Sequence, residues 1–474
     1  MIFPEEIITE IVSTLARRRP VPRDILDPEL PLWTPLWIDK SSKEALLTLC
    51  LTSRDCRRIA APILFHNVEI TGDAVSMKRR AIWLLHILDI NNSDDTKKLQ
   101  PTIARCIRYV AIRPQVFTSK WEKRRPIPTG HIDFATTYQN ERFLALLDYL
   151  SESNEVTLRG LSLTAPTWVY NGTKRWIDLP ASFRTSIRRL LRKSTLEVLN
   201  FSRINCLPDY LLNGSDIQAL SVIGQWEPPR SIPSEAADDL ALSKLPFPNL
   251  KFLQTDLHSE FMNAPNWSNN VLQEIKGICI VMDWDYDDIL ATYARFLATS
   301  SKTVEELHLS DVVFTGPTRP LHSAIGELHR LTRLTIAFSE IALDDTNMRH
   351  EILDTLSGRL EDWSCENLER LTLQLKTSSG YVHAFLGDTR RFLDCFDEVD
   401  NVLTSTKYPS LKGLRLEMSV TMEESDVIRE DDLDLVERLR THSQTHFSFC
   451  FRRLKAQGKE VVIEFSSGGI SWLL

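Results

Sequence analysis

One pattern of apolar positions recurs along most of this chain. It consists of an apolar residue, two residues of any kind, an apolar residue, one residue of any kind and a third apolar residue. In a β-strand, residues two apart point to the same side, so the last two apolar residues define the buried side of a short strand and the first lies in the turn before it. The copies are Phe65, Val68, Ile70; Ile107, Val110, Ile112; Leu158, Leu161, Leu163; Leu196, Leu199, Phe201; Ile217, Leu220, Val222; Ile275, Ile278, Ile280; Val304, Leu307, Leu309; Leu331, Leu334, Ile336; Leu368, Leu371, Leu373; and Leu411, Leu414, Leu416. Leu250 and Leu253 begin a further copy that fails at Thr255, and Ile463 and Phe465 predict a terminal strand.

Segments with helical spacing of apolar residues separate several of these strands. The spacing predicts helices over residues 140–150, 288–298, 348–356 and 385–403, each of which precedes a strand. A single strand–helix unit cannot bury its own apolar side, so the units must stack on one another. The pattern therefore predicts an array of strand–helix units.

The N-terminus follows a different, purely helical pattern. In residues 3–15 the apolar side consists of Ile7, Ile8, Ile11, Val12 and Leu15, opposite Glu5, Glu6, Thr9 and Glu10, and Pro4 suits the first turn. In residues 46–60, Leu46, Leu47, Leu49, Cys50 and Leu51 are apolar nearly all round, and Ser53 is placed to cap a third helix. So small a unit cannot bury all these side chains. It either packs on the rest of the chain or offers an apolar face to another protein.

These two N-terminal pieces resemble an F-box, the module by which adaptor subunits of cullin–RING ubiquitin ligases bind the Skp protein. The matching residues are Phe3, Pro4, Glu5, Ile7, Ile8, Ile11, Val12 and Leu15, followed by Leu46, Leu47, Leu49, Leu51, Ser53, Arg54, Arg57, Arg58 and Ile59. Two features depart from the family pattern: an insertion at about residues 16–43 separates the helices, and Cys56 stands where a bulky aromatic is usual. The resemblance implies a Skp-binding set of Phe3, Pro4, Ile7, Ile8, Ile11, Val12, Leu47, Leu49, Leu51 and Ser53.

The insertion has an unusual composition for a loop. It holds five prolines, which block regular helix, together with Leu32, Trp33, Leu36, Trp37 and Ile38. We expect it to fold onto a surface, which is that of the F-box, of the following domain or of a partner.

The array itself resembles an irregular leucine-rich-repeat solenoid, because it repeats L-x-x-L-x-L without the asparagine that usually follows. Residues 247–250 and 408–411 share an aromatic-Pro-polar-Leu leader that is similar to one in fungal F-box proteins. The copies are spaced by roughly 20 to 50 residues, more than in regular repeats. The predicted fold is therefore α/β: an all-α F-box over residues 1–65, then a leucine-rich-repeat-like solenoid of parallel strands and intervening helices over residues 66–474. The alternative is an ordinary α/β domain with buried parallel strands.

Composition narrows the class of protein. The chain has 474 residues and a net charge of −8, with 43% hydrophobic and 25% charged residues. That balance is typical of a globular protein and argues against general nucleic-acid binding. There is no apolar run long enough for a transmembrane helix and no secretory signal pattern, so we expect a cytoplasmic or nuclear protein. The eight cysteines form no C-x-x-C pair and are expected to be buried thiols.

The chain offers little chemistry. His442, His446 and Cys450 share one helical face but lack a fourth ligand for zinc. Asp283, Asp285 and Asp287 alternate as in a calcium loop that lacks the required glycine and glutamate. No phosphate-binding glycine loop or nucleophile elbow occurs. We therefore expect no catalytic residue, no metal and no cofactor.

Recognition would occur on the polar side of the strands. The candidate target-binding residues are Glu306, His308, Arg333, Arg370, Gln374, Arg415 and Glu417, with Ser310, Thr335 and Thr372 between them. Their mixed charge suits a protein segment better than a polyanion. The resemblance implies a substrate-recognition adaptor of a Skp–cullin–F-box ubiquitin ligase, with a Skp-type adaptor, a cullin and a target protein as partners. The alternative is a ubiquitin-independent scaffold in which the F-box-like helices cap the solenoid.

Overall fold

The structure is a computed structural model, in which the chain forms two compact units. The first comprises Met1–Leu250 and His258–Asn266, and the second comprises Lys251–Leu257 and Trp267–Leu474. The residues described are 5–15, 40–72, 74–90, 103–114, 138–165, 174–205, 207–208, 210–223, 246, 248–256, 274–281, 287–312, 319–338, 343–363, 365–378, 388–421, 441, 446–447, 449–467 and 470–473. The insertion at residues 16–43, with its tryptophans, lies largely outside them.

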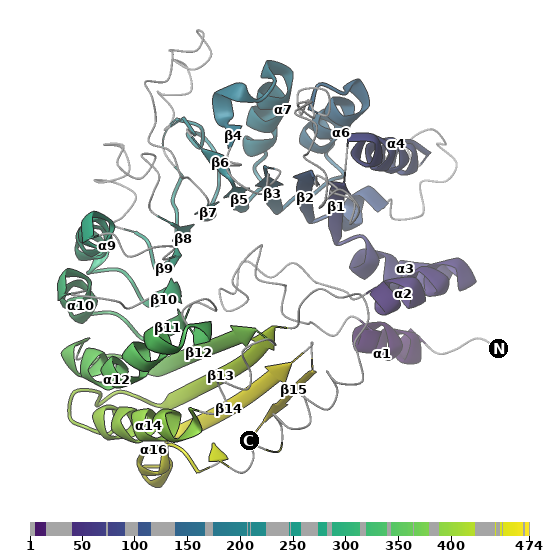
Figure 1. Ribbon diagram of the computed structural model, residues 1–474. Coiled ribbons are helices and arrows are strands. Elements are labelled where there is room, and N and C mark those ends of the chain that lie inside the picture. The colour runs from purple at the N-terminus through teal and green to yellow at the C-terminus, as the bar shows by residue number, and fades with distance from the viewer. Residues whose placement is uncertain are drawn as a thin grey trace, which may run out of the picture. The chain divides into compact units, whose positions relative to one another are not determined.

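The first unit opens with three helices and continues with strands and helices in alternation (Figure 1). Its elements are α1 (Glu5–Leu15), α2 (Lys40–Thr52), α3 (Arg54–Leu64), β1 (Asn67–Gly72), α4 (Ala74–Ile90), η2 (Ile103–Cys106), β2 (Tyr109–Pro114), α6 (Glu141–Glu152), β3 (Gly160–Thr164), β4 (Lys174–Arg175), η4 (Trp176–Asp178), α7 (Ala181–Leu191), β5 (Val198–Ser202), β6 (Ile204–Asn205) and β7 (Ala219–Ile223). Strands β1, β2, β3, β5 and β7 pair in that order, all parallel, and β4 pairs separately with β6.

The second unit repeats the alternation of strands and helices. Its elements are β8 (Phe252–Thr255), β9 (Gly277–Val281), α9 (Asp287–Ser300), β10 (Glu306–Val312), α10 (Arg319–Gly326), β11 (Arg333–Phe338), α12 (Thr346–Trp363), β12 (Arg370–Ser378), α14 (Thr389–Leu403), β13 (Gly413–Thr421), α16 (Arg452–Ala456), β14 (Glu460–Ser467) and β15 (Ile470–Leu473). Strands β8 to β14 pair in chain order and in parallel, and β15 closes the end by pairing antiparallel with β14.

The predicted strands are confirmed, and they share one frame. In each complete copy the first apolar residue lies two positions before the strand, and the other two are the second and fourth strand residues. The incomplete copy at Leu250 and Leu253 is also a strand, β8, in which Thr255 is fully buried at the apolar position. The protein is therefore α/β: among its described residues, twelve strands belong to the parallel series, β4 and β6 form a separate parallel pair, and helices are interleaved between the strands.

A repeated backbone contact explains why most copies turn in the same way. For nine of the described strands, the carbonyl of the residue before the strand accepts two N–H groups from the start of the next strand–helix repeat. Thr332 O, for example, accepts from Glu369 N at 2.8 Å and from Arg370 N at 3.0 Å. The same arrangement joins Glu369 O to Lys412 N at 2.8 Å and to Gly413 N at 3.1 Å. Each of these strand–helix repeats is thus positioned by the repeat before it, as stacking of the repeats requires.

The apolar strand residues stack in register. Leu307, Leu334, Leu371 and Leu414 are direct partners across four successive strands, and all are buried. Burying one leucine side chain stabilises the fold by about 1.5–3 kcal/mol. Figure 1 shows the helices that alternate with the strands on one side of them in each unit: α4, α6 and α7 in the first, and α9, α10, α12 and α14 in the second. This gives a solenoid-like α/β arrangement and not a sheet covered by alternating helices on both faces.

The predicted helices are confirmed, with differences at their ends. α6 begins after Asn140, whose side chain accepts from Arg142 N at 3.1 Å and from Phe143 N at 3.3 Å. α12 continues to Trp363, beyond the predicted end at residue 356, because Leu360 and Trp363 extend its buried stripe. α14 begins at Thr389, and residues 385–387 of the predicted helix lie outside the described chain.

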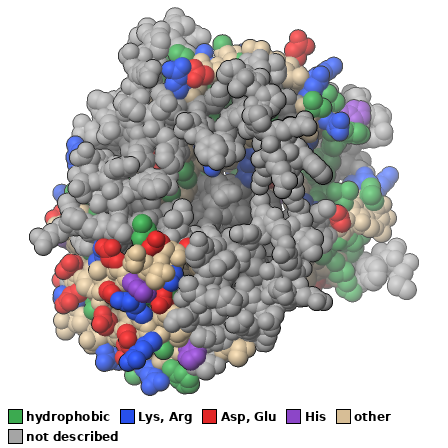
Figure 2. Space-filling view, in the orientation of Figure 1, with side chains coloured by type: hydrophobic (Ala, Val, Ile, Leu, Met, Phe, Trp, Pro, Cys, Tyr) green, Lys and Arg blue, Asp and Glu red, His purple; other side chains and the backbone are tan. Residues whose placement is uncertain are grey.

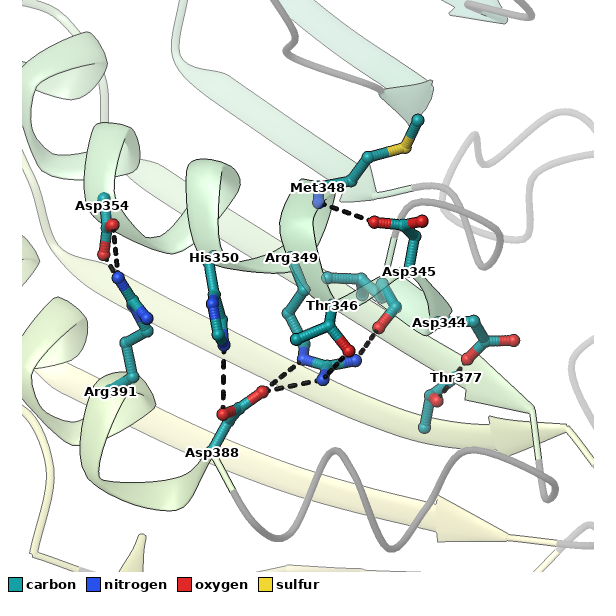
Figure 3. A network of polar contacts seen from close by, with 11 residues as sticks. Asp344, Asp345, Thr346, Met348, Arg349, His350, Asp354, Thr377, Asp388 and Arg391 are labelled. Atoms are coloured by element: carbon teal, nitrogen blue, oxygen red, sulfur yellow. Dashed lines mark hydrogen bonds and ion pairs between the residues drawn. The ribbon is translucent and has the colours of Figure 1, made fainter.

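A buried ion pair connects α12 to the start of α14 (Figure 3). Arg349 is 1% exposed, and its Nε and Nη2 both lie 2.7 Å from Oδ2 of Asp388. Nε2 of His350 lies 3.1 Å from Oδ1 of the same carboxylate. Burial raises the pKa of Asp388, but the hydrogen bonds from His350 and Arg349 outweigh it, so the net pKa lies below its ordinary value.

We expect Asp388→Asn to lower the free energy of unfolding by about 3 kcal/mol at pH 7, because Arg349 then lacks a buried counterion. Asp388 has a folded pKa below its unfolded pKa of about 3.9, so its contribution is present above that value and lost as the pH falls through the folded pKa. Urea unfolding of wild type and Asp388→Asn should show that the difference between their free energies of unfolding becomes smaller as the pH is lowered from neutral to acidic values.

Asp354→Asn is the matched control, since the exposed Asp354–Arg391 pair joins the same two helices. Asp354→Asn should lower the free energy of unfolding by less than about 1 kcal/mol. Equal losses in the two variants, or a difference between wild type and Asp388→Asn that does not depend on pH, would contradict this interpretation.

Candidate functional site

The three N-terminal helices form a hydrophobic cluster of their own. Its buried members share the inner faces of α1, α2 and α3: Ile8, Val12, Leu46, Cys50, Cys56, Ala60, Ala61 and Leu64. Cys56 occupies the place where the F-box pattern has an aromatic, and it is buried there. Arg58 Nη2 lies 2.8 Å from Glu5 Oε2 and joins α3 to α1 at the surface. The described parts of the three helices therefore form a core among themselves.

Ser53 determines where α2 ends and α3 begins. Its backbone is extended, and its side chain accepts a hydrogen bond from Cys56 N at 3.1 Å, as an N-cap does. Arg57 Nε donates to the carbonyl of Cys50 at 3.0 Å. Together these contacts hold the two helices at a fixed angle.

Four aliphatic side chains of α1 and α2 remain uncovered. They are Ile7 and Ile11, four residues apart on α1, and Leu47 and Leu51, four residues apart on α2, with exposed fractions between 41% and 74%. We call these four residues the N-terminal apolar face, and Figure 2 shows hydrophobic side chains over these helices. Grouped exposed aliphatics are uncommon on monomers and are typical of protein-binding surfaces.

The structure divides the ten predicted Skp-binding residues by role. Ile7, Ile11, Leu47 and Leu51 form the N-terminal apolar face, whereas Ile8 and Val12 are buried in the cluster and Leu49 is half-buried against it. Ser53 is exposed and acts as the helix cap. Phe3 and Pro4 lie outside the described residues.

A second candidate surface lies on the polar side of the strands in the second unit. Parallel pairing places Glu306, Arg333 and Arg370 in one row, because each is the direct partner of the next. A neighbouring row runs through Gln254, Cys279, His308, Thr335, Thr372 and Arg415. A third joins Gln374, Glu417 and Glu464. All seven predicted target-binding residues thus come to one face of this unit.

Most of the charges on this strand face are paired with one another. Glu306 forms an ion pair with Arg333. Arg415 lies 2.6 Å from both Glu417 and Glu464, and Gln374 Nε2 donates to Glu417 at 2.9 Å. Glu464 was not among the residues predicted from the sequence, although it occupies the polar position between Ile463 and Phe465 of the terminal strand.

Accessibility differs along the same face. Arg333, Arg370 and Arg415 are exposed, whereas His308 and Gln374 are buried and reach solvent only marginally. The exposed arginines could bind carboxylates of a protein segment, and the buried residues contribute to strand packing.

The described residues hold no cluster suited to a metal. No group of three His, Cys, Asp or Glu side chains among them could hold an ion. His442 lies outside the described chain, and burial raises the pKa of the Cys450 thiol to about 12. Asp283 and Asp285 are also outside it, and Asp287 begins α9. The seven described cysteines form no disulfide and are buried, as predicted.

Comparison with known proteins identifies no family for this chain. Within the described part of the chain, no helix combines the length and apolar character needed to cross a bilayer. No family model matches the chain, and no curated protein matches it.

Proposed function

We propose that this chain is a substrate-recognition adaptor of a Skp–cullin–F-box ubiquitin ligase. α1–α3 would act as the F-box and bind a Skp-type adaptor, and the leucine-rich-repeat-like array would bind a target protein. The observation that carries the proposal is the N-terminal apolar face: four aliphatic side chains left exposed on a helical cluster that already has its own core.

The energetics of this face favour a partner. Moving apolar surface out of water contributes about 25 cal/mol per Å² buried, so covering four half-exposed aliphatics would contribute a few kcal/mol in total. The alternative function is a scaffold in which these helices cap the array, and it expects the same side chains to be buried in the monomer. Their exposure supports docking over capping.

The second unit supplies the surface for a target. Its exposed arginines Arg333, Arg370 and Arg415 lie on one face of a row of parallel strands. In this proposal the chain performs no chemistry itself, and the ligase works by holding a target close to a charged conjugating enzyme. The partners are a Skp-type adaptor, through it a cullin, and a target protein.

We expect the double variant Ile11→Asp, Leu51→Asp to lose binding to a purified Skp-type adaptor by more than about 30-fold, because two carboxylates would be buried against apolar groups. Both side chains are exposed, so thermal unfolding should be unchanged. Titration calorimetry with the purified adaptor measures the effect.

Phe449→Asp is the matched control, since Phe449 is an equally exposed apolar residue far along the sequence. Ile8→Asp should instead unfold the cluster, because Ile8 is buried. The proposal fails if the wild-type chain does not bind the adaptor, or if the double variant binds as well as wild type.

The strand face makes a separate prediction. Target proteins that co-purify with the wild-type chain from cells should be less abundant with the double variant Arg333→Glu, Arg370→Glu. The Skp-type adaptor should co-purify equally with both chains. Reversing an exposed arginine on the helix side, Arg390→Glu in α14, should leave the set unchanged. Quantitative mass spectrometry of the proteins that co-purify with the three chains measures the effect. An equal loss of these proteins with Arg390→Glu would show that net charge alone is responsible.

A further inference from the structure

Helix α4 has apolar side chains on two opposite sides. Its inner side carries Met77, Ala81, Leu84 and Leu88, which are buried where α4 packs against β1, α6 and η2. This side accounts for the position of α4 at the start of the helix layer of the first unit. It leaves the opposite side without an obvious structural role.

The outer side combines exposed apolar and basic residues. Val75, Ile82 and Trp83 are between 41% and 63% exposed, and Lys78, Arg79 and His86 are exposed among them. Their spacing of three, four, seven, eight and eleven residues from Val75 places all six on one side of a helix. We call these six residues the α4 outer face. Figure 2 shows hydrophobic and basic side chains next to each other over α4.

The charged residues among the six of the α4 outer face are Lys78 and Arg79. None of its six residues is acidic, although the whole chain has a net charge of −8. Neither Lys78 nor Arg79 has an ion-pair partner among the described residues, whereas Arg80, which lies off this face, is held by Thr71. The ring of Trp83 meets that of His86 edge-on at 6.5 Å between centroids. An aromatic side chain beside unpaired cations is a frequent anchor in protein interfaces.

We propose that the α4 outer face binds an acidic amphipathic helix of a partner protein. The carboxylates of such a helix would pair with Lys78 and Arg79, and its aliphatic side chains would cover Val75, Ile82 and Trp83. This is the helix-to-helix form of recognition, in which apolar anchors repeat every three to four residues. The surface is separate from the N-terminal apolar face, so the inference does not depend on the proposed function.

Two observations favour a protein over an anionic membrane. In a helix that lies in a bilayer surface, basic side chains flank the apolar stripe and stay near the headgroups. Here Arg79 and His86 lie inside the stripe, between Val75, Ile82 and Trp83, and insertion would remove them from water. The buried inner side also prevents α4 from rotating to present a wider apolar surface.

The test measures binding of a synthetic peptide to the full chain by fluorescence anisotropy. The probe is an amphipathic helix of about five turns with leucine on one side and glutamate elsewhere. We expect the wild-type chain to bind it, and the double variant Lys78→Glu, Arg79→Glu and the variant Trp83→Ala each to bind at least tenfold more weakly. Binding should also weaken as salt is raised from about 50 to 200 mM.

The controls separate this surface from general charge and stickiness. The double variant Lys302→Glu, Arg390→Glu reverses two exposed basic residues elsewhere, and Phe449→Ala removes an aromatic as exposed as Trp83. Both should bind like wild type, and a peptide with lysine in place of glutamate should not bind. Retained binding of a Skp-type adaptor by the α4 variants separates failure here from failure of the proposed function.

Three results would overturn the proposal. The first is no binding of the acidic peptide by the wild-type chain. The second is an equal loss of affinity in the α4 variants and the controls. The third is binding to phosphatidylserine-rich vesicles that depends on Trp83 and is tighter than binding to the peptide, which would identify α4 as a membrane-surface helix.

Discussion

The structure depends on one constraint: no strand–helix unit of this chain can bury its apolar side without the next unit beside it. Two apolar residues on each short strand form only part of a core, and they become a core when Leu307, Leu334, Leu371 and Leu414 align across successive strands. The carbonyl before most of the strands fixes that alignment by accepting two N–H groups from the following strand–helix repeat. Beyond the parallel series, β15 pairs antiparallel along β14.

The helix layer needs polar contacts that the strand pattern does not specify. Arg349 is fully buried and is tolerated because Asp388 supplies a counterion at the start of α14. In the same layer the carboxylate of Asp400, also buried, accepts from Arg453 N at 2.8 Å and from Leu454 N at 3.0 Å. It therefore satisfies the free N–H groups at the first turn of α16. Hydrogen bonds and ion pairs of this kind are directional. The two contacts therefore fix the relative orientation of successive helices as well as stabilising their packing.

The exposed surfaces differ in what a partner would have to displace. On the strand face, Glu306, Arg333, Arg415, Glu417 and Glu464 already pair with each other, so a ligand there exchanges existing ion pairs for new ones. The N-terminal apolar face and the α4 outer face carry no such internal pairing, and covering them releases water from apolar surface. Binding energy is therefore more readily available on these helices, whereas the strand face is better suited to selecting among partners.

The sequence by itself determined the strands, their buried side and most helix positions, because a side chain's direction within an element follows from local periodicity. It also indicated the N-terminal helices and the cap at Ser53. It could not separate Ile8 from Ile7, since both lie on the apolar side of the first helix, or Leu46 from Leu47, since their helix is apolar nearly all round. Only the tertiary structure decided that Ile8 and Leu46 face the cluster while Ile7 and Leu47 face water. The same holds for the strand face of the second unit, where His308 is buried and Arg333 is exposed. Which surfaces meet depends on residues far apart in the chain, and no local pattern encodes that.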